Sequence, residues 1–146
     1  MSQKNTSNHL FTAPAAVLVA GDLLVILSFV AIGRQSHALS TADLAADMLT
    51  ALPFVTGWFV VAPWFGLYRA TVSTTPAQLL PRLALTWLVA VPLSHILRAL
   101  LLQRPIPGGI PFTFVLVSLA YLGVVMLVWR LAYVWWANRA ARSAQP

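Results

Sequence analysis

Four long apolar stretches, separated by short polar or proline-rich segments, account for most of this chain. They cover residues 13–33, 48–68, 83–102 and 111–136. At a helical rise of about 1.5 Å per residue, each is long enough to cross a hydrocarbon core about 30 Å thick. The pattern therefore predicts an all-α integral membrane bundle of four transmembrane helices, with residues 1–146 forming a single membrane domain.

Prolines in these stretches indicate where the predicted helices begin and where one of them bends or breaks. Pro14 suits a first helical turn, where its missing N–H would have no partner in any case. The second stretch contains Pro53 and Pro63, and two prolines in one span predict a kinked or broken helix. Residues 69–82 are expected to form a short polar hairpin loop, and residues 103–111 a rigid non-helical turn.

The composition argues against a soluble domain. Hydrophobic residues make up 60% of the chain and charged residues only 8%, whereas a soluble domain carries about 25% charged residues. The net charge of +6 does not indicate nucleic acid, because the basic residues flank apolar stretches and form no tract. Membrane lipid is the expected partner.

The chain has no cysteine and its three histidines lack metal-ligand spacing, so we expect no metal site, and no cofactor is identified.

The basic residues also predict how the chain is threaded. Four spans would place both termini on one side of the membrane. That side carries Lys4, Arg69, Arg82, Arg139 and Arg142, and the other side carries Arg34 and Arg104. Because Lys and Arg accumulate in short cytoplasmic loops, we expect a multi-pass protein of the cell membrane with both termini in the cytoplasm.

Two charged residues inside the spans predict an intramembrane site. Asp22 lies well inside the first stretch, where a carboxylate costs about 2.5–3.5 kcal/mol on insertion scales, so it should face the interior and have a partner. Arg130, near the end of the fourth stretch, is the expected partner, because a guanidinium can bind both carboxylate oxygens. Alternatively, Arg130 extends to the cytoplasmic headgroups and a neutral Asp22 binds a backbone carbonyl.

Further polar residues lie in the third stretch and the first loop. His95 and Arg98 are three residues apart, share a helix face, and complete the intramembrane polar site with Asp22 and Arg130. Arg98 either extends outward to the headgroups or meets an acid of the first loop. His95 is expected to be a hydrogen-bonded interior residue, with proton exchange as the alternative. The first loop supplies a polar cluster of Arg34, His37, Asp43 and Asp47.

Three short phrases occur in a characteristic order and spacing. They are Gly-Asp in the first helix followed by Ile-Gly-Arg-Gln-Ser-His at residues 32–37, Pro-Phe-Val-Thr-Gly-Trp at 53–58, and Trp-Arg at 129–130. In these the chain resembles the DUF3054 family of small polytopic membrane proteins, over residues 13–136. The family has no assigned activity, so the resemblance transfers no catalytic residues. It implies that Asp22, Arg34, His37, Arg98 and Arg130 belong to a shared pattern.

Two functions from different classes remain open. The polar interior can bind or pass a small anionic solute or a proton, and a homodimer would be needed to complete a pathway. Alternatively, the ion pair fixes helix register, and the chain is an accessory or assembly subunit of a larger membrane complex. An enzyme acting on lipid would need a carboxylate pair such as Asp43 and Asp47, for which a solvated turn is the simpler interpretation. We therefore favour a role other than catalysis.

Overall fold

The protein is helical throughout the part of the chain that the computed structural model describes, residues 13–36 and 44–143. Within these residues there is no strand, and the helices are α1 (Ala13–Ser36), α2 (Leu44–Val61), α3 (Ala70–Thr74), α4 (Pro76–Leu101) and α5 (Phe112–Ser143). The expected all-α fold class is therefore confirmed over these ranges. Two members of the predicted loop cluster, His37 and Asp43, lie outside the described residues.

Three helices are long and apolar enough to cross a membrane. They are Ala15–Gln35 within α1, Pro76–Leu101 and Phe112–Ser143, and Asp47–Val61 forms a shorter apolar helix. Large apolar side chains cover the outside of these helices; Leu24 is 67% exposed and Val128 is 61% exposed. A contiguous apolar surface of this kind is unfavourable in water. The helix lengths and this surface indicate a membrane protein.

The helix predicted over residues 48–68 is wrong in its last third. α2 begins at Leu44 and ends at Val61, just before Pro63. Proline lacks a backbone donor, and its ring collides with the carbonyl four residues earlier, so the helix does not continue. Turns follow, and Gly66 adopts a left-handed φ of 69°, which glycine reaches without steric cost. Pro53 remains inside α2, so the break expected from the two prolines occurs at the second one.

Residues 69–82 do not form the expected polar loop. α3 occupies Ala70–Thr74, and α4 already begins at Pro76. A proline in the first helical turn loses no hydrogen bond, because the N–H groups there have no intrahelical acceptor. The helix of the third apolar stretch therefore starts at residue 76 rather than 83. α5 likewise runs past the expected end at residue 136, as far as Ser143.

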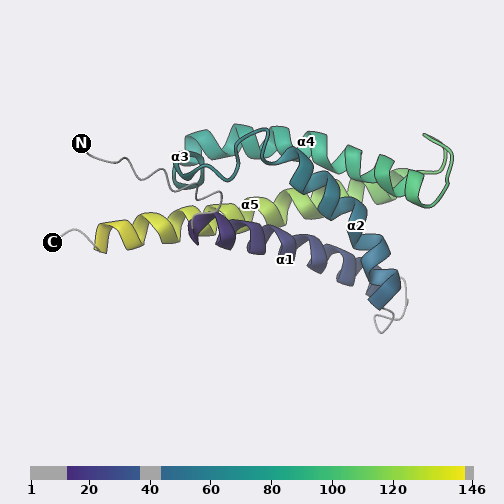
Figure 1. The fold of residues 1–146 in the computed structure, drawn as a ribbon, viewed down its shortest axis with the longest axis horizontal. Helices are drawn as coiled ribbons and strands as arrows, with labels where there is room; N and C mark the ends of the chain where they lie inside the picture. Colours follow the sequence, from purple (N-terminus) through teal and green to yellow (C-terminus); the bar gives the residue numbers. More distant parts are fainter. Residues whose placement is uncertain (1–12, 37–43, 144–146) are drawn as a thin grey trace, which may run out of the picture.

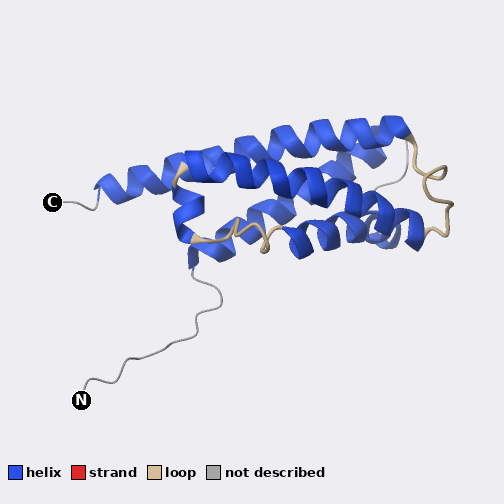
Figure 2. Ribbon diagram, turned by 90° about the horizontal axis from the view of Figure 1, so that it is seen from above, coloured by secondary structure: helices blue, strands red, loops and turns tan. Residues whose placement is uncertain are grey.

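The four longer helices contact one another in cyclic order. α1 packs against α2, α2 against α4, α4 against α5, and α5 packs back against α1. α2 crosses the others obliquely (Figure 1). We call the end where α1 begins, α3 lies and α5 finishes the terminal end. The opposite end, with the connection between α4 and α5, is the loop end. α5 extends beyond the other helices at the terminal end (Figure 2).

Aromatic and aliphatic side chains fill the interior between the helices. The most enclosed of them include Phe29, Phe54, Trp58, Leu79 and Met126. Phe29 and Phe54 meet edge to face with ring centroids 5.1 Å apart, a favourable arrangement for aromatic rings. Asp22, His95 and Arg130 are buried in the same interior, where each polar atom needs a partner.

Candidate functional site

Asp22 and Arg130 form a buried ion pair between α1 and α5. Asp22 on α1 is 0% exposed and Arg130 on α5 is 1% exposed. The guanidinium binds both carboxylate oxygens: Nε donates to Oδ1 at 3.0 Å and Nη2 donates to Oδ2. Such a two-pronged bond fixes the orientation of both groups. The structure thus joins the two residues whose pairing the sequence predicted; that they serve a function remains a hypothesis.

Aromatic side chains complete the environment of the Asp22 carboxylate. The Trp58 indole N–H and the Tyr68 hydroxyl each donate to Oδ2 at 2.9 Å. The Trp129 indole N–H donates to Oδ1 at 3.2 Å. Asp22 therefore accepts bonds at both oxygens from α2, from the turn that follows α2, and from α5. Since a carboxylate offers about four lone-pair directions, we infer that this acid is fully satisfied.

The break after α2 supplies the remaining partners of Arg130. Its Nη1 donates to the carbonyl oxygen of Leu67 at 3.0 Å. Its guanidinium also lies over the ring of Tyr68, 5.1 Å from the centroid, a favourable cation–π distance. Both Leu67 and Tyr68 lie in the turns that begin where Pro63 ends the helix. Because these turns are not helical, their carbonyl and side chain can point back at α5.

His95 lies apart from this ion pair. Its Nε2 is 2.6 Å from the hydroxyl oxygen of Ser118 on α5, and that hydroxyl donates to the Val115 carbonyl oxygen at 2.9 Å. Its ring meets the rings of Phe54 and Phe114 edge to face. The side chain is 4% exposed. This geometry is that of a hydrogen-bonded interior histidine.

Arg34 and Asp47 form the second ion pair, at the loop end. The Arg34 guanidinium, near the end of α1, contacts the carboxylate of Asp47 in the first turns of α2. Arg98 does not share this acid: none of the described carboxylates binds it, although the sequence had left Asp47 open as its partner. His37 and Asp43 cannot be placed, because they lie outside the described ranges.

A pocket of about 620 Å³ opens at the loop end and brings three arginines together. Arg34, Arg98 and Arg104 line it, together with Thr50 and Thr113. Its apolar lining is Phe29, Val30, Gly33, Pro111, Phe114 and Val117. We refer to it as the loop-end pocket. Its three arginines make it a cavity at which positive charge gathers.

Arg98 has an incomplete set of partners in this pocket. Its Nε is buried and donates a hydrogen bond to none of the described residues. Its guanidinium lies over the ring of Phe114, 5.1 Å from the centroid. Arg104, in the exposed connection between α4 and α5, is close enough to repel it. Two like charges in one pocket, with none of the described acids bound to them, favour a bound anion.

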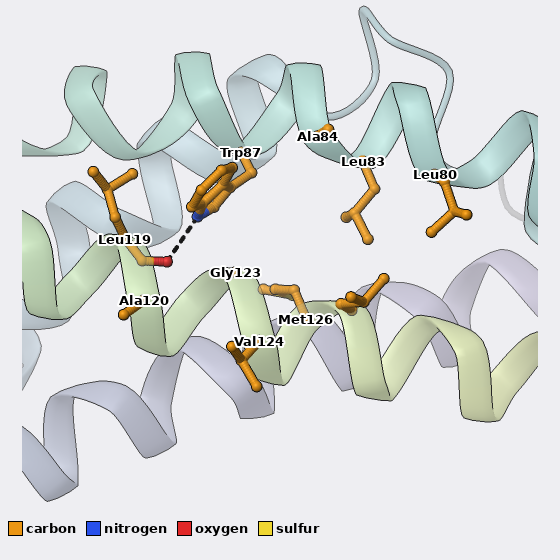
Figure 3. Close-up of a pocket in the computed structure, with 10 residues that line it drawn as sticks. Leu80, Leu83, Ala84, Trp87, Leu119, Ala120, Gly123, Val124 and Met126 are labelled. Carbon is orange, nitrogen blue, oxygen red and sulfur yellow. Dashed lines mark hydrogen bonds between the residues drawn. The ribbon is translucent and has the colours of Figure 1, made fainter.

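A second, apolar groove runs between α4 and α5. It has a volume of about 480 Å³ and is lined by Trp87 and Leu83 from α4 and by Ala120, Gly123 and Met126 from α5, among others (Figure 3). The Trp87 indole N–H donates to the backbone carbonyl of Leu119 at 3.0 Å (dashed in Figure 3). With that donor satisfied, the surface of the groove is mostly apolar.

Several partners in these sites were missed in the sequence. Trp58, Tyr68 and Trp129 were not identified as partners of Asp22, and Arg104 was considered only as an orientation signal. One feature of the sequence could have indicated Trp129 as a partner of Asp22: it directly precedes Arg130. Among the described residues no group of three or more His, Cys, Asp or Glu side chains lies close enough to hold a metal ion.

Together these features define the class: an all-α protein with three helices able to cross a membrane and a buried ion pair between the first and last of them. The family model for DUF3054, described as a protein of unknown function, matches residues 19–133. The chain therefore belongs to the DUF3054 family, which confirms the resemblance seen in its sequence. No curated protein and no solved structure matches the chain.

Proposed function

We propose that this protein binds a small anion in the loop-end pocket while embedded in a membrane. Arg98 carries the proposal. It lines the pocket with a buried, unpaired Nε and a second arginine beside it. A cation in a partly apolar environment is costly without a counter-charge. A bound anion would supply that charge.

The chain has few acidic residues that could neutralise Arg98, which supports the assignment of an anion site. There are nine Lys or Arg residues and only three Asp or Glu residues. Asp22 is committed to Arg130, and Asp47 to Arg34. Asp43 lies outside the described residues. Within the described part of the chain, Arg98 and Arg104 therefore share a pocket with no acid of their own.

An anion in this pocket fits better than passage of a solute or proton through the centre. The Asp22 carboxylate accepts bonds at both oxygens and is sealed from solvent. His95 is closed in by Ser118 and two phenylalanine rings. The Asp22–Arg130 pair then acts as a structural lock that holds α1, α5 and the turns after α2 in register.

Anion-dependent stabilisation of the purified full chain tests the proposal, because a ligand that binds only the folded state raises the unfolding midpoint. We would measure that midpoint in a neutral detergent with acetate, inorganic phosphate and octyl phosphate. We expect at least one of them to raise the midpoint of the wild type and not that of Arg98→Gln. Arg139→Gln, at the terminal end, is the matched control and should respond as the wild type does. An identical response in Arg98→Gln, or none of the three acting, would contradict the proposal.

The proposed setting is a four-helix transmembrane bundle with both termini in the cytoplasm. Three membrane-length helices, plus α2 continued by the turns at residues 62–68, supply four crossings. Arg69, Arg82, Arg139 and Arg142 lie at or near the terminal end, against Arg34 and Arg104 at the loop end, and the excess of basic residues favours the cytoplasm. A reporter fused after residue 146 should read cytoplasmic; an external reading would reverse the orientation.

One observation favours a second candidate, an accessory subunit of a larger complex. Only 17% of the apolar window of α5 is buried, against 44% for α1, and the groove with Gly123 lies between α5 and α4 (Figure 3). Small residues allow helices to approach closely. We expect Ala120→Leu to remove a stoichiometric partner in mild detergent, and Val128→Leu, outside the groove, to retain it. A chain that purifies without any partner argues against this role.

A further inference from the structure

The loop-end pocket has a charged side and an apolar side. Arg34, Arg98 and Arg104 form the charged side, whereas Phe29 and Phe114 belong to the apolar lining. The two phenylalanine rings stack with centroids 6.0 Å apart and an interplanar angle of 29°. An inorganic anion would use the arginines alone and leave this apolar surface without a ligand.

Polarity changes in the same direction along both helices that flank the pocket. On α1, Val30 precedes Arg34 by one turn, and on α5, Val117 follows Thr113 by one turn. Residues four apart lie on the same face of a helix, about 6 Å apart along its axis. Both walls are thus polar at the loop end and apolar one turn nearer the centre of the protein.

Phe114 contacts both the charged side and the apolar side of the pocket. The Arg98 guanidinium lies over one face of its ring, while the ring also stacks on Phe29. A ligand group held at Arg98 would therefore begin next to aromatic surface. The ligand atoms attached directly to that group would then contact apolar side chains.

Resting on the proposed function, we infer that the ligand of the loop-end pocket is an amphipathic anion. Its acidic head group, a phosphate or a carboxylate, binds Arg98 and Arg104. Its hydrocarbon part lies toward Val30 and Val117, one helical turn farther from the loop end. Two sources share this chemistry: a lipid of the bilayer, or a soluble organic acid with an alkyl chain.

Three probes separate the contribution of the head group from that of the chain. They are inorganic phosphate, octyl phosphate and the zwitterion octyl phosphocholine, titrated into the full-length protein in phosphatidylcholine nanodiscs. Because burying methylene groups is favourable, octyl phosphate should bind about tenfold or more tighter than inorganic phosphate. It should also bind more tightly than octyl phosphocholine, which has the same chain and no net charge.

Two matched valines on α5 test the hydrocarbon part. Val117, 59% exposed, lines the pocket, and Val128, 61% exposed, does not. Val117→Thr should weaken octyl phosphate several-fold and leave inorganic phosphate unchanged, because it places a hydroxyl on the apolar side. Val128→Thr should change the binding of neither probe.

Two arginine variants test the head-group contacts. Arg98→Gln and Arg104→Gln should both weaken the binding of octyl phosphate. Arg104 lies on the exposed connection, so Arg104→Gln replaces Arg98→Gln as the test if the latter does not fold.

Each outcome bears on the inference in a different way. Equal affinity for inorganic phosphate and octyl phosphate, both lost in Arg98→Gln, overturns the amphipathic ligand and leaves anion binding intact. No binding of either probe overturns both. Octyl phosphocholine binding as tightly as octyl phosphate also overturns the inference. If octyl phosphate binds as expected, adding phosphatidic acid to the nanodiscs distinguishes the sources: competition supports a bilayer lipid, and unchanged affinity supports a soluble acid.

Discussion

The indole ring of Trp129 occupies the space that a side chain at Gly21 would need. A β-carbon built on Gly21 would overlap atoms of that ring. The indole N–H then reaches the next residue of α1, donating to Oδ1 of Asp22 at 3.2 Å. Glycine at this position is therefore required by the close approach of α5 to α1, which brings two successive residues of α5 to the same carboxylate.

Gly21→Ala tests this close approach. We expect the added methyl group to displace Trp129 and to lower stability by about 1–3 kcal/mol, as overpacked interiors do. Gly33→Ala is the matched control, because a β-carbon at Gly33 in the same helix meets nothing within 4 Å. Chemical unfolding in detergent, followed by tryptophan fluorescence, measures both variants. Equal stability of the two would show that the Trp129 contact does not constrain α1.

Neutralising Asp22 should be among the most damaging single substitutions in the chain. Asp22→Asn leaves the Arg130 guanidinium buried without a counter-charge, and breaking a buried pair in this way costs about 3–5 kcal/mol. Replacing both residues, as Asp22→Leu with Arg130→Met, should recover part of that loss. Asp47→Asn is the control, since the Asp47 side chain is 25% exposed and that of Asp22 is 0% exposed, so its loss should cost less. A silent Asp22→Asn would refute the structural lock.

Tyr68→Phe isolates one bond to the carboxylate, because it removes the hydroxyl and keeps the ring over Arg130. Hydrogen bonds to charged groups contribute about 1.5–3 kcal/mol, so we expect a loss of stability in that range. Tyr121→Phe provides the comparison: its hydroxyl lies 3.0 Å from the neutral hydroxyl of Ser28, where about 0.5–1.5 kcal/mol is expected. Unfolding free energies that rank the other way round would argue that the Tyr68 hydroxyl does not stabilise the Asp22–Arg130 pair.

Ser118→Ala should leave the ring nitrogen of His95 buried without a partner. An orphaned buried polar group costs about 1–3 kcal/mol, and the loss should be measurable by unfolding. Ser94→Ala is the control, because the Ser94 hydroxyl bonds only to the Ala90 carbonyl of its own helix at 2.7 Å. If Ser118→Ala is no worse than Ser94→Ala, His95 has no need of the serine.

The central pair was accessible to sequence reasoning for a simple reason. An acid inside an apolar stretch must have a partner, and Arg130 was the cation at a compatible depth. The other three side chains that bind Asp22 were not accessible in this way. Trp58, Tyr68 and Trp129 are equally suited to the membrane surface, and an aromatic donor binds inside only if its helix face turns inward. The direction of that face is a tertiary property.

The sequence by itself determined the helical class, the long apolar helices and a proline-induced break in the second stretch, because length, polarity and a missing backbone donor act locally. Only the tertiary structure decided which charges meet. It pairs Arg130 with Asp22 and Arg34 with Asp47, and it places Arg98 beside Arg104 in the loop-end pocket. The physical reason is that helices apolar on nearly every side carry little information about which neighbour each face will contact. Charge pairing depends on that lateral order of the helices.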